Sequence, residues 1–178
     1  DDLLIDVRLT DGQENILSAP HPGRAITFAE TEGRPMGRQA AGVRGIRLAE
    51  GDYVVGAARA RKGAQVLSIT ENGYGKRTPV EDFSVHHRGG SGIVLHGLTD
   101  KTGLVAGIAV VDLDNDIMII TDDGVIIRTP VEDIRQCGRS SQGVIVMRTG
   151  EDVRVISIAR TDKEEADEDE AETEADGQ

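Results

Sequence analysis

Three segments of this chain repeat one pattern at intervals of about fifty residues, and this periodicity constrains the fold more than any other feature. Each copy holds an apolar run, a turn ending in Gly, a second apolar run, an acidic corner and a loop in which Arg precedes Gly. The copies align without a gap over residues 16–43, 66–93 and 117–144. A repeat of this length is typical of propellers and solenoids rather than of a compact enzyme domain.

Turn signals divide each copy into four short strands. In the third copy, the apolar runs 117–121 and 125–128 flank an Asp-Asp-Gly turn, which predicts a β-hairpin. Two further strands are predicted at 144–148 and 153–159. The corresponding strands are predicted at 15–19, 25–28, 43–48 and 53–58 in the first copy, and at 65–70, 74–78, 93–98 and 105–110 in the second. Four antiparallel strands in about fifty residues are the size of a propeller blade.

We therefore predict an all-β fold, a β-pinwheel or propeller of three four-stranded blades at about 13–60, 61–112 and 113–160 within a partial domain spanning 1–160. Residues 3–10 are predicted to be the last strand of a preceding blade. Three blades do not close a ring of the usual size, and open strand edges would remain at both ends. We expect them to be part of a larger disc.

The net charge of −12 is concentrated at the C-terminal end of the chain. From Thr161 onward there are ten Asp or Glu and a single Lys, whereas the preceding residues are nearly balanced. An acidic segment without aromatic residues buries too little surface to become ordered. Residues 161–178 are therefore predicted to be a disordered acidic tail, which either solubilises the chain or competes as a polyanion for a basic surface.

Several functional classes are disfavoured by what the sequence lacks. It contains no run of eighteen apolar residues, so we expect no membrane span. It also has no basic segment before an apolar one, so we expect no signal peptide and predict that the sequence starts within a longer protein. A single cysteine, Cys137, forms no internal disulfide, which is typical of a reducing, cytoplasmic compartment.

No residue pattern predicts catalysis or metal binding. The adjacent His86 and His87 point to opposite sides of an extended chain, and no residue with ligand spacing accompanies them. Cys137 has no His beside it in sequence, and Tyr53 and Tyr74 lie on predicted strands without a catalytic partner. We predict that the chain is not an enzyme by itself.

The loop between the second and third strands of each copy places an Arg four residues before a Gly: Arg38, Arg88 and Arg139. A flexible loop rich in hydrogen-bond donors brings guanidinium and backbone N–H groups close to phosphate oxygens. Alternatively, each Arg holds its blade together through the corner carboxylates Glu32, Asp82 and Asp133. The sequence leaves both roles open.

Further basic residues lie in these loops and on or beside the second and third strands. If the blades pack radially, these residues share a rim and form a positive stripe, which binds a nucleic acid backbone without reading its sequence. For any single member, an exposed arginine in a salt bridge is the alternative. The predicted nucleic-acid contact set is Arg34, Arg38, Arg44, Arg47, Lys76, Arg77, Arg88, Arg128, Arg135, Arg139 and Arg148.

The segments 36–46, 72–79 and 128–134 resemble blades of the C-terminal domain of the DNA gyrase A subunit, and the resemblance extends from residue 3 to about residue 160. It implies the last three blades of a six-bladed β-pinwheel whose basic rim wraps DNA and supports negative supercoiling. The family's box of a Gln and three basic residues around a Gly pair is not matched, since the nearest segment, 86–92, keeps only Arg88 as a basic residue.

The resemblance also implies partners and a location. These are double-stranded DNA and, in a heterotetramer, the gyrase B subunit together with the remainder of the gyrase A subunit, in the bacterial cytoplasm at the nucleoid. No cofactor is implied for this chain, because ATP and Mg²⁺ would be bound by other domains or subunits of the parent ATP-dependent topoisomerase. Two alternatives stay open: the C-terminal domain of the topoisomerase IV A subunit, and a propeller that acts as a protein-interaction scaffold.

Overall fold

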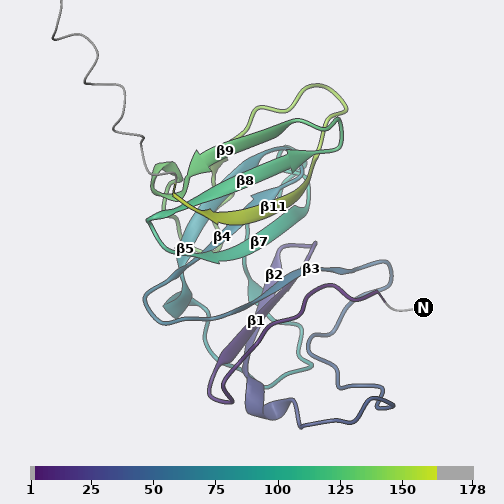
Figure 1. Ribbon diagram of the computed structural model, residues 1–178. Coiled ribbons are helices and arrows are strands. Elements are labelled where there is room, and N and C mark those ends of the chain that lie inside the picture. The colour runs from purple at the N-terminus through teal and green to yellow at the C-terminus, as the bar shows by residue number, and fades with distance from the viewer. Residues whose placement is uncertain (1–2, 164–178) are drawn as a thin grey trace, which may run out of the picture.

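The computed structural model describes residues 3–163, which form three antiparallel sheets joined by loops (Figure 1). Within that range there is no α-helix, and no helix long and apolar enough to cross a membrane. The predicted all-β fold is confirmed. The strands are β1 (Asn15–Pro20), β2 (Arg24–Ala29), β3 (Val54–Arg59), β4 (Gln65–Thr70), β5 (Tyr74–Pro79), β6 (Ile93–Val94), β7 (Val105–Val111), β8 (Asn115–Thr121), β9 (Ile126–Pro130), β10 (Val144–Ile145) and β11 (Val155–Asp162).

Each repeat begins with a hairpin that ends at its acidic corner. The hairpins are β1–β2, β4–β5 and β8–β9. In the second and third repeats the outgoing strand ends at Pro79 or Pro130, because proline has no N–H for the ladder. A single 3₁₀ turn follows in every repeat: η1 (Glu30–Glu32), η2 (Val80–Asp82) and η3 (Val131–Asp133).

The sheets exchange strands between repeats, which differs from the predicted one-repeat blades. The strand orders are β3-β1-β2-β6, β10-β5-β4-β7 and β11-β8-β9. The short strands β6 and β10 thus leave their own repeats and pair with β2 and β5 of the repeats before them. Two sheets have four strands, and the third has three.

Glycine permits this exchange at the point where the loop meets the preceding sheet. Gly92 precedes β6 with φ +67°, and a Cβ at this position would overlap the carbonyl oxygen of Ala25. Gly143 stands in the same relation to the carbonyl of Gly75. Only a residue without a side chain allows so close an approach at positive φ, which explains why this glycine recurs.

Three further predictions about strands and order are modified by the structure. Residues 43–48 and 3–10 form no strand, because neither segment pairs with a sheet edge within the described range. In the predicted tail, Thr161 and Asp162 pair with Asp116 and Asn115 as the end of β11, so order extends beyond the predicted boundary. The rest of that tail, residues 164–178, lies outside the described residues.

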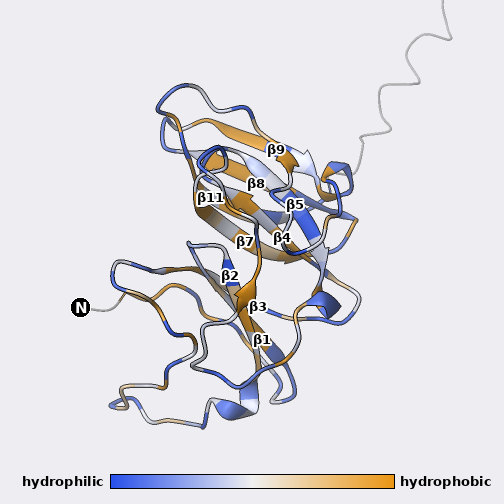
Figure 2. Ribbon diagram, turned by 180° about the vertical axis from the view of Figure 1, so that it is seen from behind, coloured by the Kyte–Doolittle hydropathy of each residue, from blue (hydrophilic) through white to orange (hydrophobic). Residues whose placement is uncertain are grey.

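The apolar residues form two cores, each lying between neighbouring sheets. One joins Leu17 and Ala25 of the first sheet to Val66 and Val110 of the second. The other joins the second sheet to the third, with Leu67 packed near Ile117. Figure 2 shows the apolar residues concentrated on the strands, and the polar ones in the loops. The sheets therefore pack face against face like blades, without a single central globule.

Candidate nucleic-acid interface

Six of the predicted contact residues have exposed side chains that form no hydrogen bond or ion pair with the residues described. Four lie between η1 and β3, and two lie in the third repeat, one shortly after η3 and one shortly after the exchanged strand β10. An exposed guanidinium without a protein partner keeps its donors available for phosphate oxygens. These six residues, hereafter the open arginines, are Arg34, Arg38, Arg44, Arg47, Arg135 and Arg148.

Lys76 is not on the rim, contrary to the prediction. Its side chain is 0% exposed, and its Nζ donates hydrogen bonds to the carbonyl oxygens of Gly138, at 2.7 Å, and Arg139. Burial lowers the pKa of Lys76 to about 8. The strand register turns this position toward the third repeat's loop, and the equivalent residue of the first repeat, Ile26, is also buried.

A buried histidine holds the same loop from a second side. His96 Nδ1 lies 2.8 Å from Ser68 Oγ, and Nε2 lies 2.9 Å from the carbonyl oxygen of Gln142. Burial lowers the pKa of His96 to about 4. The imidazole is therefore neutral near pH 7, with the Nε2 proton donated to Gln142 and the Ser68 hydroxyl donating to Nδ1. Sequence reasoning missed this residue, since apolar Ile46 and Met147 take its place in the other repeats.

Arg77 uses its guanidinium group within the protein. It donates to Gln65 Oε1 at 2.8 Å, to the carbonyl oxygen of Ile134, and to that of Glu132 at 3.3 Å. These bonds attach the second sheet to the acidic corner of the third repeat. A role in phosphate binding would require Arg77 to give up contacts between repeats.

Arg128, the equivalent residue of the third repeat, is held in the same way. Its Nε donates to Asp116 Oδ2 at 2.8 Å, and its Nη2 donates to the carbonyl oxygen of Asp162 at 2.7 Å. The structure thus shows Arg128 in a salt bridge, as the alternative drawn from the sequence had it, and the Asp116 carboxylate that it contacts is buried.

Two of the three recurrent loop arginines, Arg88 and Arg139, brace neighbouring repeats. The Arg88 Nε donates to the carbonyl oxygen of Glu32 at 3.0 Å, and its Nη1 donates to that of Arg44 at 3.2 Å. The Arg139 Nη1 makes the equivalent contact, 3.2 Å from the carbonyl oxygen of Val94. The backbone N–H of Arg88 also donates to the Glu32 carboxylate and lowers the pKa of that group. The sequence left open that the arginine of each loop contacts the acidic corner of its own repeat. In the structure the Glu32 corner of the first repeat is contacted by Arg88, which belongs to the following repeat.

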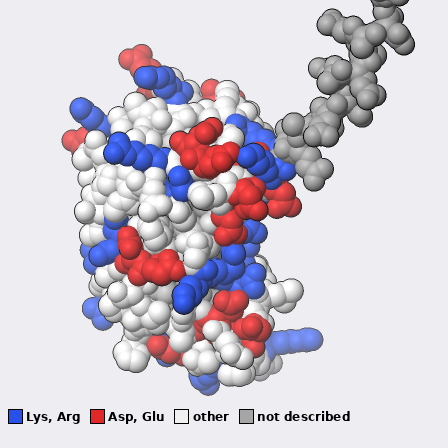
Figure 3. Space-filling view, turned by 90° about the vertical axis from the view of Figure 1, so that its left-hand side faces the viewer, with Lys and Arg blue, Asp and Glu red and all other residues white. Residues whose placement is uncertain are grey.

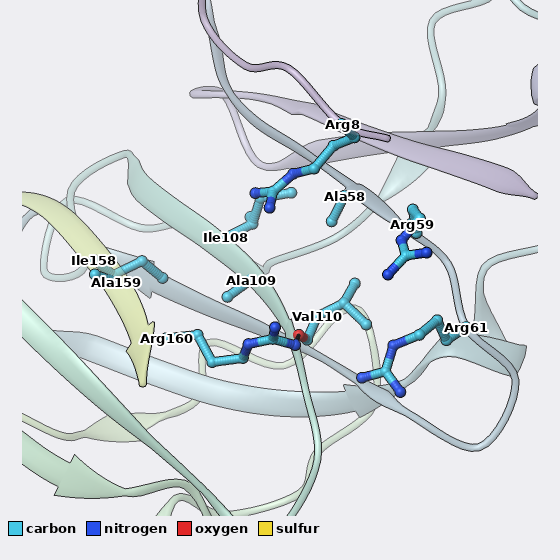
Figure 4. Close-up of a pocket in the computed structure, with 10 residues that line it drawn as sticks. All are labelled: Arg8, Ala58, Arg59, Arg61, Ile108, Ala109, Val110, Ile158, Ala159 and Arg160. Atoms are coloured by element: carbon cyan, nitrogen blue, oxygen red, sulfur yellow. Dashed lines mark hydrogen bonds between the residues drawn. The ribbon is translucent and has the colours of Figure 1, made fainter. Parts of the chain in front are cut away.

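A second group of arginines surrounds a cavity of about 370 Å³ between the inner strands β3, β7 and β11 (Figure 4). The side chains of Arg8, Arg59, Arg61 and Arg160 converge on it. Three of these are paired with carboxylates: Arg8 with Asp6 at 3.0 Å, Arg59 with Glu14 at 3.3 Å and Arg61 with Asp112 at 2.6 Å. Internal pairing neutralises most of this cluster, so the open arginines remain the better phosphate ligands.

Charge on the surface is mixed rather than separated by sign. On the face shown in Figure 3, Lys and Arg are interspersed with Asp and Glu. This face does not present the continuous positive stripe that the sequence predicts. We therefore take the two loop regions that carry the open arginines as the candidate interface.

Comparison with known proteins agrees with the repeats seen in the structure. The family model described as "DNA gyrase C-terminal domain, beta-propeller" matches three times, over residues 23–61, 64–112 and 115–162. The DNA gyrase A subunits of Staphylococcus aureus strains MRSA252 and NCTC 8325 are 51% and 49% identical over 170 residues. That alignment covers 94% of this chain but 19% of each relative, so the chain spans about a fifth of their length.

Solved structures give the same result. A C-terminal domain of DNA topoisomerase IV is similar with a TM-score of 0.82 and 32% identity, over 88% of this chain and 49% of that one. A DNA gyrase A C-terminal domain is similar with a TM-score of 0.77 and 26% identity, over 83% of this chain and 50% of that one. With three matched repeats covering most of its length, this chain belongs to the DNA gyrase C-terminal domain, beta-propeller family.

Proposed function

We propose that this chain binds the backbone of duplex DNA through the open arginines and helps to wrap it as a non-catalytic part of a type IIA topoisomerase, the DNA gyrase A subunit. The observation that carries the proposal is that these six exposed guanidinium groups have no partner among the residues described. The gyrase A name of the relatives, at 49–51% identity, supports the assignment.

The rest of the parent enzyme follows from the same assignment. The chain would act with the gyrase B subunit, beside the remainder of the gyrase A subunit, in the bacterial cytoplasm at the nucleoid. ATP and Mg²⁺ would be used in other parts of an ATP-dependent enzyme. This chain would contribute the path of the DNA, and strand cleavage would occur elsewhere.

The physical basis of binding is neutralisation of phosphates. Each Lys or Arg that contacts a phosphate releases condensed counterions, so affinity falls with salt at a slope set by the number of contacts. Bending the duplex around stacked sheets costs about 1–6 kcal/mol, an energy that depends on the sequence bent. We therefore expect strong salt dependence and a preference for deformable DNA, without base-specific contacts.

A salt titration of the double variant Arg44→Gln/Arg47→Gln tests this assignment. We expect weaker binding to linear duplex and a log–log salt slope smaller by about 2, because each lost phosphate contact removes about one unit. Arg59→Gln is the matched control, because Arg59, at the end of β3, is already paired with Glu14 and its replacement should leave the slope unchanged. A wild-type affinity that does not respond to salt would contradict the proposal.

The topoisomerase IV alternative is supported by the higher TM-score of that match, 0.82 against 0.77. The extent of DNA wrapping distinguishes a topoisomerase IV-type domain from a gyrase-type domain. A relaxed plasmid is incubated with the protein, treated with a nicking-closing topoisomerase and deproteinised. A gyrase-type domain should leave supercoils of one sign in proportion to bound protein, whereas a topoisomerase IV-type domain should leave few. A protein-interaction scaffold should neither shift linear duplex nor leave any supercoils.

A further inference from the structure

The arginine-lined cavity of about 370 Å³ lies away from the exchanged strands. It is bounded by β3, β7 and β11. In the strand orders, β3 is at the opposite edge of the first sheet from β6, and β7 is at the opposite edge of the second sheet from β10. None of the open arginines lines the cavity. The basic residues that do line it are therefore not used by the proposed binding of DNA.

Strand register places arginine at the same position in the first and third repeats. Arg59 pairs with Ile16, and Arg160 pairs with Ile117, which is the equivalent residue of the third repeat. The second repeat has Val110 at this position, and Val110 lines the cavity together with both arginines. Two neighbouring repeats thus supply guanidinium groups on either side of an aliphatic residue.

A third guanidinium group approaches the same space. Arg61 follows β3, and in Figure 4 its side chain and those of Arg59 and Arg160 are directed toward the part of the cavity around Val110. The walls between them are lined by small residues, which leave the space open: Ala58, Ala109 and Ala159. The cavity therefore combines an apolar lining with three converging cations.

Most of the donors on these guanidinium groups are not used within the protein. Arg59 and Arg61 each donate from one terminal nitrogen to a carboxylate. Arg160 donates from Nη1 to the carbonyl oxygen of Val110 at 3.3 Å. A guanidinium group has five N–H donors in a planar fork. Each of the three side chains therefore keeps donors for a ligand without losing its contact in the protein.

The charge of the cluster is not fully compensated. Arg59 and Arg61 each face one carboxylate, whereas Arg160 has no carboxylate partner among residues 3–163. The side chains of Arg61 and Asp112 are 35% and 42% exposed, and ion pairs as exposed as this one are weak. A ligand with one negative charge would gain little over the carboxylates already present. A ligand with several adjacent charges would contact all three guanidinium groups together.

We propose that this cavity binds a short polyphosphate chain, two or three phosphate groups long, through Arg59, Arg61 and Arg160. Guanidinium groups bind phosphate oxygens in a bidentate manner, and a chain presents such oxygens on several sides. The volume of about 370 Å³ is within the range of small-molecule sites, about 300–1,000 Å³. A DNA duplex does not enter a cavity of this size, so the site is separate from the proposed DNA contacts. The chain is either inorganic or the triphosphate of a nucleotide.

Isothermal titration calorimetry with orthophosphate, pyrophosphate, tripolyphosphate and ATP, in the absence of divalent cations, tests the proposal. Tripolyphosphate should bind at least about tenfold more tightly than orthophosphate, because it makes additional charge-assisted hydrogen bonds. Equal affinities for ATP and tripolyphosphate would identify the phosphate chain alone as the ligand, and a higher affinity for ATP would identify a nucleotide. The proposal is overturned if no chain binds, or if orthophosphate binds as tightly as the chains.

Three variants establish where the chain binds. Arg160→Gln should weaken tripolyphosphate binding by about tenfold or more. Asp112→Asn should strengthen it by about two- to fivefold, because Arg61 loses its competing carboxylate. Arg34→Gln is the matched control, since it removes the same charge from an open arginine outside the cavity and should leave the dissociation constant unchanged.

Circular dichroism of each variant establishes that it is folded. If Arg160→Gln and Arg34→Gln weaken binding equally, the anion responds only to the charge of the whole molecule, and a site in this cavity is excluded.

Discussion

At the scale of single residues, two buried titratable side chains determine how the third repeat's loop is placed. Lys76 and His96 reach residues 138–142 from the second sheet and from the segment after β6. A buried lysine is unfavourable unless its N–H groups are satisfied, and here two carbonyl oxygens accept from it. In the proposed function, both residues would affect DNA binding through the loop that carries Arg135.

His96 makes stability depend on pH in a defined window. Its folded-state pKa, about 4, lies below the ordinary value of 6.5, so between these values the unfolded chain binds more protons. The free energy of unfolding should therefore fall as pH decreases from 6.5 to 4, with His96 contributing up to about 3 kcal/mol. Urea denaturation at several pH values measures this.

The variant His96→Met isolates the contribution of this residue. Methionine occupies the equivalent position in the third repeat, as Met147, where it is largely buried. Stability of the variant should depend less on pH than that of the wild type between pH 6.5 and 4, whatever its absolute value. Equal slopes for the two proteins would show that His96 is not the titrating group.

At the scale of elements, the exchanged strands β6 and β10 make the first and second sheets each depend on two repeats. Arg88 reaches back from its loop to Glu32 and Arg44, so it fastens the second repeat to the first. Arg34 lies close by in the first repeat's loop and has no such contact among the residues described. Variants of these two arginines therefore test the bracing of repeats separately from the proposed contact with DNA.

Arg88→Gln should lower the free energy of unfolding by about 1–3 kcal/mol, because two backbone carbonyls lose a charged donor. Its effect on the salt slope of DNA binding should be negligible. Arg34→Gln should do the opposite, leaving stability within about 0.5 kcal/mol and reducing the slope by about 1. If Arg88→Gln reduces the slope and leaves stability unchanged, its assignment as a brace is wrong.

At the scale of the whole molecule, three stacked sheets place the open arginines in two separate regions. Arg34, Arg38, Arg44 and Arg47 lie in the loop between η1 and β3, whereas Arg135 and Arg148 lie on either side of β10 in the sequence, the third-repeat strand that completes the second sheet. A duplex that contacts both regions must pass along the stack.

The sequence by itself determined the class of fold and the family. The fifty-residue period, the recurrent glycines and the apolar strands are local features, and local features specify hairpins and turns. The alternative drawn from the sequence, that Arg88 and Arg139 hold their own blades together through the corner carboxylates, differs from the structure, in which their guanidinium groups donate to backbone carbonyls of the preceding repeat. The sequence did not reveal which lysine or arginine is exposed, because Lys76 and the open arginines look alike in a pattern of residue types.

Only the tertiary structure decided which strand completes which sheet. β6 pairs with β2, from which it is separated by more than sixty residues, because a glycine loop carries it to the preceding repeat. Such pairing depends on space and on backbone groups that every residue possesses, so no side-chain pattern records it. The same reason explains the burial of Lys76 and His96: their environment is supplied by carbonyl oxygens of a different repeat.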